Sequence, residues 1–187
     1  MSSRTFDPLR LDVGVFAAEH GELHGEWPLH GLQRLAASGL AASAPGDVPL
    51  AEGGHVVWHA RGEQTPRSGG LDTWLHLAAQ ADVVVECQRC LSPLTLPLEV
   101  RRRLLFVQGE DAAAQIDASS EDDVLAMTRA LDLRELVEDE LLLAMPLVPL
   151  HEVCPEPLSL PVEAELVAEQ PHPFAALAAL KQKGSSN

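Results

Sequence analysis

The stretch Val83-Val84-Val85-Glu86-Cys87-Gln88-Arg89-Cys90-Leu91-Ser92-Pro93 decides how this chain folds. Three valines lead into a short turn that carries two cysteines, and Ser92-Pro93 reverses the direction of the chain. After the turn, apolar side chains occupy alternate positions, which is typical of a strand with one buried face. These positions are Leu94, Leu96, Leu98, Val100, Leu104 and Phe106. The stretch therefore predicts an antiparallel hairpin with two thiols at its tip.

Arg102 interrupts this alternation, whereas Arg101 and Arg103 share the opposite parity with Glu99. We expect a bulge near Arg102 that releases its side chain to solvent. With Arg89, these arginines form the basic cluster of the sequence, and guanidinium groups bind phosphates through paired hydrogen bonds. The four arginines are therefore candidates for RNA binding. The alternative is a strand face whose arginines pair with nearby carboxylates.

Cys87 and Cys90 supply two ligands from one turn, and His151 and Cys154 repeat the spacing further along the chain. Zinc takes four thiolate or imidazole ligands in structural sites, so these residues have the types and number of a closed zinc centre. The alternative is unmetallated thiols, because spacing alone does not show that the two halves meet. A thioredoxin-like redox role is less favoured, since the first two cysteines lie between strands and do not open a helix.

Other segments extend the sheet upstream. Residues 21–28 and 55–61 are predicted as short strands, separated by turns rich in glycine and proline. Residues 32–42 have the alanine and leucine content of a short helix. Residues 71–86 alternate loosely and lead into the cysteine turn. The histidines before that turn are dispersed and are expected at the surface or in structural hydrogen bonds; they are His20, His24, His30, His55, His59 and His76.

An amphipathic helix is predicted after Asp132, which forms a capping-box-like start with Glu135, and Pro146 ends it. Its apolar face consists of Leu133, Leu136, Val137, Leu141 and Ala144. The consecutive acids Glu138-Asp139-Glu140 point in different directions and are interpreted as a solvated face. Their alternative role, metal-dependent hydrolysis, has no accompanying motif. We therefore expect no enzyme activity and no catalytic residues.

The net charge of −15 is concentrated in the C-terminal part of the chain. Residues 1–109 hold 12 acidic and 9 basic side chains (net −3), and residues 110–187 hold 16 and 4 (net −12). Such a field repels phosphate backbones, so any RNA contact must be local. Neither a secretory leader nor an apolar run of membrane-spanning length is present, which favours a cytoplasmic protein without a membrane partner.

The expected fold is α+β: an antiparallel, hairpin-rich sheet with one long amphipathic helix packed on it and a flexible C-terminal extension. Residues 1–154 are predicted as one domain, in which the acidic stretch 110–124 is a loop or disordered insert. Residues 155–173 have the composition of a proline-rich, acidic linker. Residues 174–183 are predicted as a short helix whose face docks on its own domain or on a partner. That face carries Phe174, Leu177 and Leu180.

Three motifs in order give the chain a resemblance to the bacterial YceD family. They are Glu86-Cys87-Gln88-Arg89-Cys90, the stretch 132–149 followed by His151, and Pro173-Phe174-Ala175 to Leu180-Lys181; Asp7-Pro8-Leu9-Arg10 matches more weakly. The resemblance implies a role in the synthesis, processing or stability of 23S ribosomal RNA, because the family is described as large ribosomal RNA subunit accumulation protein.

Combined with the acidity, this resemblance favours a non-enzymatic ribosome-biogenesis factor. Its acidic surface and C-terminal helix would recruit a ribosome-assembly or RNA-processing protein, such as a nuclease or a basic ribosomal protein. The alternatives are a direct RNA-binding module that uses the arginine cluster and, less favoured, a metal-dependent RNA hydrolase.

Overall fold

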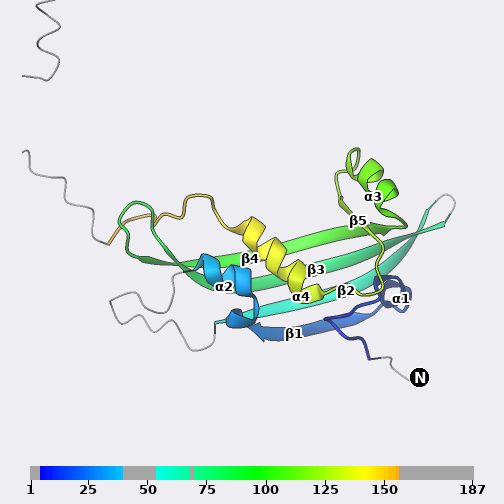
Figure 1. Cartoon of the computed structure of the whole chain (residues 1–187), viewed down its shortest axis with the longest axis horizontal. Helices are drawn as coiled ribbons and strands as arrows, with labels where there is room; N and C mark the ends of the chain where they lie inside the picture. Colours follow the sequence, from blue (N-terminus) through cyan, green and yellow to red (C-terminus); the bar gives the residue numbers. More distant parts are fainter. Residues whose placement is uncertain (1–4, 40–53, 68–69, 156–187) are drawn as a thin grey trace, which may run out of the picture. The chain divides into compact units, whose positions relative to one another are not determined.

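A five-stranded sheet forms the frame of the molecule (Figure 1). The computed structural model describes residues 5–39, 54–67 and 70–155. The strands follow each other in sequence order across the sheet, antiparallel from β1 to β4, and β5 is parallel to β4. They are β1 (Glu22–Pro28), β2 (His55–Arg67), β3 (Gly70–Glu86), β4 (Pro93–Val107) and β5 (Asp123–Ala126). The predicted α+β class is confirmed.

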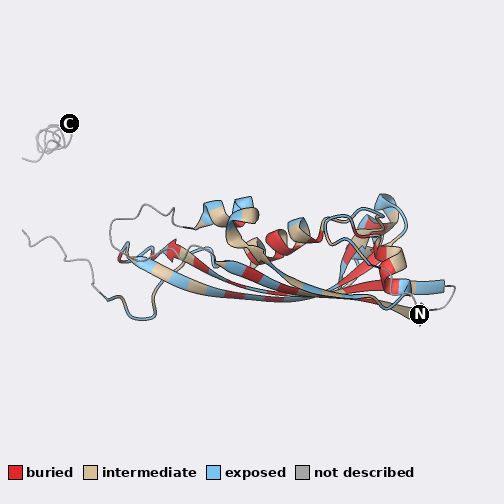
Figure 2. Ribbon diagram, turned by 90° about the horizontal axis from the view of Figure 1, so that it is seen from below, coloured by how far each residue is buried: buried red, intermediate tan, exposed pale blue. Residues whose placement is uncertain are grey.

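The helices of the described ranges are short. They are α1 (Val13–Ala18), the 3-10 turn η1 (Leu29–Gly31), α2 (Gln33–Ser38), α3 (Glu110–Asp117) and α4 (Leu133–Ala144). None of them is long and apolar enough to cross a bilayer, which takes about 20 residues. In the edge view, α2 and α4 lie on one side of the sheet, and buried residues line the space between the layers (Figure 2). The main hydrophobic core therefore lies between the sheet and these helices.

Helix α4 follows its predicted pattern. The Asp132 carboxylate accepts hydrogen bonds from the backbone nitrogens of Arg134 (2.9 Å) and Glu135 (3.1 Å), which caps the first turn. One turn apart, Leu133, Val137 and Leu141 are completely buried against β3 and β4. The predicted start and apolar face of this helix are confirmed.

The β3–β4 hairpin is also confirmed, but the bulge predicted near Arg102 is wrong. The ladder runs without interruption from Glu86 opposite Pro93 to Thr73 opposite Phe106, and Arg102 pairs with Leu77. Arg102 stays on the helix-covered face because Glu140 of α4 accepts a hydrogen bond from it. A buried partner, and not a change of register, accommodates this charge.

The prediction of a loop or disordered insert at 110–124 is wrong. Its residues form α3 and the start of β5, joined by a hydrogen bond of 3.1 Å from the Val124 nitrogen to Asp117 Oδ1. Ala113 and Val124 form a small second core with Trp74 and Leu105. Since neighbours of Leu105 along β4 point into the main core, α3 covers the opposite face at this end of the sheet. The stretch 110–124 can pack with few apolar residues of its own because Trp74 and Leu105 of the sheet complete this second core.

The solvated face predicted for Glu138-Asp139-Glu140 is wrong for both glutamates, which are only 8% exposed. Glu138 Oε1 accepts hydrogen bonds from the backbone nitrogens of Arg34 (2.7 Å) and Leu35 (3.1 Å) at the start of α2. The Arg34 guanidinium binds the other oxygen at 3.0 Å. A carboxylate of α4 therefore caps another helix, whose existence the composition of 32–42 had predicted.

Candidate metal centre

A tight turn at the tip of the β3–β4 hairpin positions the first pair of cysteines. The Cys87 nitrogen donates to the Ser92 carbonyl (3.0 Å), and the Leu91 nitrogen donates to the Cys87 carbonyl (2.8 Å). Leu91 adopts a left-handed backbone conformation, with φ of 61°. This closure keeps Cys87 and Cys90 buried, with their sulfur atoms within 4.8 Å of each other.

The segment after α4 brings the second pair of candidate ligands to this turn. Pro146 prevents the helix from continuing, and the chain then runs beside the hairpin tip (Figure 1). The Gln88 nitrogen donates to the Pro149 carbonyl (2.9 Å), and the His151 nitrogen donates to Cys87 Sγ (3.4 Å). The two halves of the predicted site therefore meet in space.

The ligand atoms of Cys87, Cys90, His151 and Cys154 all lie within 4.8 Å of one another. His151 Nδ1 is 3.4 Å from Cys90 Sγ, and His151 Nε2 is 3.1 Å from the Pro93 carbonyl. A carbonyl only accepts hydrogen bonds, so Nε2 carries a proton and Nδ1 is left to face the sulfurs. The cluster can bind a metal ion, and four protein ligands would leave no open position for catalysis.

Hydrogen bonds make the thiols of the hairpin turn more acidic than usual. Burial alone would raise the pKa of Cys87, but amides of His151, Cys90 and Arg89, together with the His151 ring, lower that pKa to about 5. Burial also opposes ionisation of Cys90, yet the Ser92 amide lowers its pKa. The pKa of Cys154 is raised by burial and by the two neighbouring thiols. Because metal ions bind thiolates, the turn favours the ligating form of its two cysteines.

The four candidate RNA-binding arginines do not form a single surface. Arg89 is exposed at the hairpin tip, and Arg102 lies on the helix-covered face. Arg101 and Arg103 share the outer face, where Arg101 binds Glu99 at 2.8 Å. Arg103 binds Asp122 at 2.8 Å and stacks over the Trp74 ring, 4.2 Å from its centroid. The alternative that the sequence left open, a strand face whose arginines pair with carboxylates, is therefore observed for Arg101 and Arg103.

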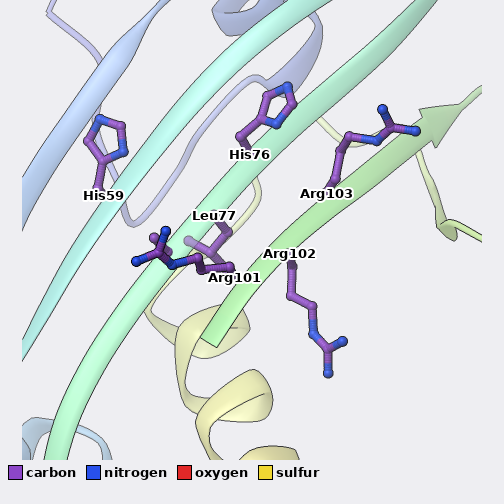
Figure 3. A pocket seen from close by; sticks show the side chains of 7 residues that line it. His59, His76, Leu77, Arg101, Arg102 and Arg103 are labelled. Carbon is purple, nitrogen blue, oxygen red and sulfur yellow. The ribbon is translucent and has the colours of Figure 1, made fainter. Parts of the chain in front are cut away.

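An open hollow of about 350 Å³ on the sheet brings two histidines beside these arginines (Figure 3). His59 comes from β2 and His76 from β3, and the strand register places them in the same rows as Arg101 and Arg103. His59 binds Glu22 at 2.7 Å, and His76 binds Glu63 at 2.8 Å. Sequence reasoning treated these histidines as dispersed; only the register between strands, which no local pattern gives, brings them together.

The remaining predicted site lies outside the described residues. It is the partner-binding face of Phe174, Leu177 and Leu180 in the helix expected at 174–183, which follows the linker expected at 155–173.

Comparison with known proteins identifies the family to which these features belong. The family model described as "Large ribosomal RNA subunit accumulation protein YceD" matches residues 75–181, from the middle of β3 to beyond Cys154. The chain belongs to the YceD family. The match includes the four clustered side chains and the whole of α4, so the candidate metal centre lies in the matched part of the chain.

A protein of Haemophilus influenzae named "Large ribosomal RNA subunit accumulation protein YceD" is 40% identical to this chain over 109 residues. The similarity covers 56% of this chain and 63% of that relative, which is less than two thirds of its length. No solved structure matches the chain.

Proposed function

We propose that this chain acts in ribosome biogenesis, as a non-enzymatic factor that supports the accumulation of 23S ribosomal RNA. The observation that carries this proposal is membership of the YceD family over residues 75–181. The named relative is 40% identical over 109 residues. The test is deletion of the gene: the ratio of precursor to mature 23S RNA should rise and free large subunits should fall in sucrose gradients. Unchanged RNA and subunits in the deletion strain would contradict the proposal.

We further propose that Cys87, Cys90, His151 and Cys154 hold a structural zinc ion. Three thiols and one imidazole match the preferred ligands of zinc, and the Pro93 carbonyl orients the imidazole. The ion would connect the hairpin tip to the segment that follows α4. Elemental analysis of protein purified without chelator should find about one zinc ion per chain. Absence of stoichiometric zinc would contradict this assignment.

A basic protein is the partner that the charge distribution favours. The chain carries a net charge of −15, so a phosphate backbone is repelled by its long-range field and a cationic protein is attracted. In this proposal the helix expected at 174–183 contributes to binding. A version of the chain that ends at His172 should therefore bind purified large-subunit ribosomal proteins more weakly than the full-length chain does. Equal affinities would remove Phe174, Leu177 and Leu180 from the partner site.

Direct RNA binding is the second candidate, supported by the grouping of Arg101 and Arg103 with His59 and His76. Each of these side chains already has a carboxylate partner, which an RNA phosphate would have to displace. This function predicts salt-sensitive binding to 23S fragments that weakens in R101A and R103A. Arg129 is exposed and does not line this hollow, so R129A is the matched control. Binding that is the same in all three variants would contradict direct RNA contact.

A metal-dependent RNA hydrolase has little support. Glu138 is held by α2, and Glu140 is held by Arg102, so both carboxylates already have structural partners. The proposed catalytic role would require cleavage of 23S RNA by the purified protein that disappears in E138Q or E140Q. We expect no cleavage in any of the three proteins.

A further inference from the structure

Exposed large apolar side chains gather around the metal centre. In the ranges 5–39, 54–67 and 70–155, nine such side chains are exposed, and six of them lie in the hairpin turn, in the last turn of α4 or between α4 and Cys154. These six are Leu91, Leu143, Leu147, Val148, Leu150 and Val153. The other three, Leu9, Val57 and Leu71, are scattered over the chain. Isolated exposed leucines are ordinary, but a concentration of this kind marks an interaction surface.

The clustered ligands hold these side chains together in space. Leu91 follows Cys90 directly, Leu150 precedes His151, and Val153 precedes Cys154. Because the ligand atoms lie within 4.8 Å of one another, the residues next to them in sequence also lie close to this cluster. The hydrogen bond from Gln88 to the Pro149 carbonyl fixes Val148 and Leu150 beside the turn as well. We call Leu91, Leu147, Val148, Leu150 and Val153 the apolar collar.

The collar is not part of the core of the described domain. Leu147 is fully exposed (101%) and Val153 is 85% exposed, although the backbone that carries them is anchored to the hairpin. Neither side chain contributes burial within the described residues. Covering such side chains would be favourable, because it removes apolar surface from water. The collar therefore exposes apolar surface that a binding partner could bury, on a backbone that hydrogen bonds hold in place.

We propose that the apolar collar is the docking surface for an apolar segment of a basic protein partner. This inference rests on the proposed function and places its partner site at the metal centre. The occupant follows from the charge: among the described residues that adjoin the ligands in sequence, the exposed charged side chains are Glu86, Glu152 and Arg89, which leaves one negative charge in excess. A second copy, itself at −15, and an RNA backbone are both repelled by this protein. A cationic protein segment gains attraction at the rim and apolar burial at the centre.

Three collar residues that do not ligate the metal provide the test. The triple variant L147S/V148S/V153S should bind purified basic proteins of the large ribosomal subunit on the order of tenfold more weakly than the unmodified chain. The variant V57S/L71S, which alters two exposed apolar side chains elsewhere, is the matched control and should bind within about twofold. Zinc content and circular dichroism of both variants show whether the frame is intact. Equal binding by the two variants would overturn the proposal.

A photo-crosslinking amino acid at position 147 identifies the occupant directly. Crosslinks to one or more large-subunit proteins support the proposal. Crosslinks to a second copy, to residues 156–187 of the same chain, or to 23S RNA fragments would each overturn it. The proposed function is judged separately: a deletion strain with normal 23S RNA contradicts that function. A defective deletion strain that L147S/V148S/V153S fully restores contradicts only the docking surface.

Discussion

Arg102, in the middle of β4, donates a hydrogen bond of 2.7 Å from its Nε to Glu140 Oε2 on α4. The arginine side chain is 41% exposed and the glutamate side chain only 10%. The carboxylate raises the pKa of Arg102 through this hydrogen bond and through its charge. The pair joins the helix layer to the sheet at the one position where the alternation of β4 places a charge on the covered face.

Replacing Arg102 by methionine should lower the free energy of unfolding by about 1–3 kcal/mol. The reason is that Glu140 would remain buried without a partner, which costs more than the pair itself contributes. The double variant R102M/E140L should recover most of this loss, because it removes both charges together. Urea denaturation followed by circular dichroism measures these differences.

The matched control for this pair is R101M, on the exposed face of the same strand. Arg101 binds Glu99 at the surface, where its side chain is 79% exposed. An exposed pair of this kind contributes about 0–1 kcal/mol, so R101M should change stability little. If R101M and R102M lowered the free energy of unfolding equally, the burial of Glu140 would not be the cause of the destabilisation.

Local patterns predicted those parts of the fold that depend on neighbours in sequence. Alternation gave the β3–β4 hairpin, and Asp132 gave the start of α4, because pleating and capping act within a few residues. The partners of Arg102 and Glu138 lie on other elements, 38 and 104 residues away, respectively. No pattern within one segment indicates such a contact, so a bulge and a solvated face were predicted in their place.

For the candidate metal centre too, the sequence predicted the local features and did not predict the contacts between distant elements. Residue type and spacing identified Cys87, Cys90, His151 and Cys154, because few side chains bind zinc and the ligands come in closely spaced pairs. That the pairs meet depends on the length of α4 and on the Gln88–Pro149 hydrogen bond, which follow from tertiary packing. The hollow beside His59 and His76 needs the register of three strands, and sequence reasoning did not find it.

Acid should weaken the contact between α4 and α2 through Glu138. Burial opposes ionisation, but the Leu35 amide and the Arg34 amide and guanidinium hold the pKa of Glu138 below its usual 4.5. The folded state thus binds this proton less readily than the unfolded state. The stabilisation is fully present above the unfolded pKa and is lost as pH falls through the folded one. The difference in free energy of unfolding between the unmodified chain and E138Q should therefore narrow as the pH falls below the usual pKa of 4.5 and through the lower pKa of the folded state.

Urea titrations at several pH values measure this narrowing. E135Q removes a carboxylate from the exposed side of the same helix and serves as the control for the change in net charge. The prediction would be contradicted if the difference in free energy of unfolding between the unmodified chain and E138Q stayed constant over the whole pH range. In that case the ionised form of Glu138 would not be what stabilises the contact.

Loss of a thiol ligand should remove the metal and loosen the junction after α4. We expect C90S to retain less than about a tenth of the zinc of the unmodified chain, since structural sites need their full ligand set. A chelator should lower the melting temperature of the unmodified chain and leave that of C90S nearly unchanged. Added zinc should restore the melting temperature of the chelator-treated unmodified chain and should not raise that of C90S. H76A, which alters a histidine of the outer face, is the control and should keep its zinc.

Gly62 on β2 should not tolerate a methyl group, because α1 packs directly on its backbone. A Cβ atom at this position would lie 2.7 Å from Ala17 Cα and 2.9 Å from the Phe16 carbonyl carbon. Both are backbone atoms, so the whole helix would have to move away from the sheet. We expect G62A to lower the free energy of unfolding by about 1–3 kcal/mol, the usual cost of overpacking. At Gly70, a Cβ would meet nothing within 4 Å, so G70A is the control and should be nearly neutral. If urea denaturation shows the same stability for both variants, the close approach of α1 to β2 is wrong.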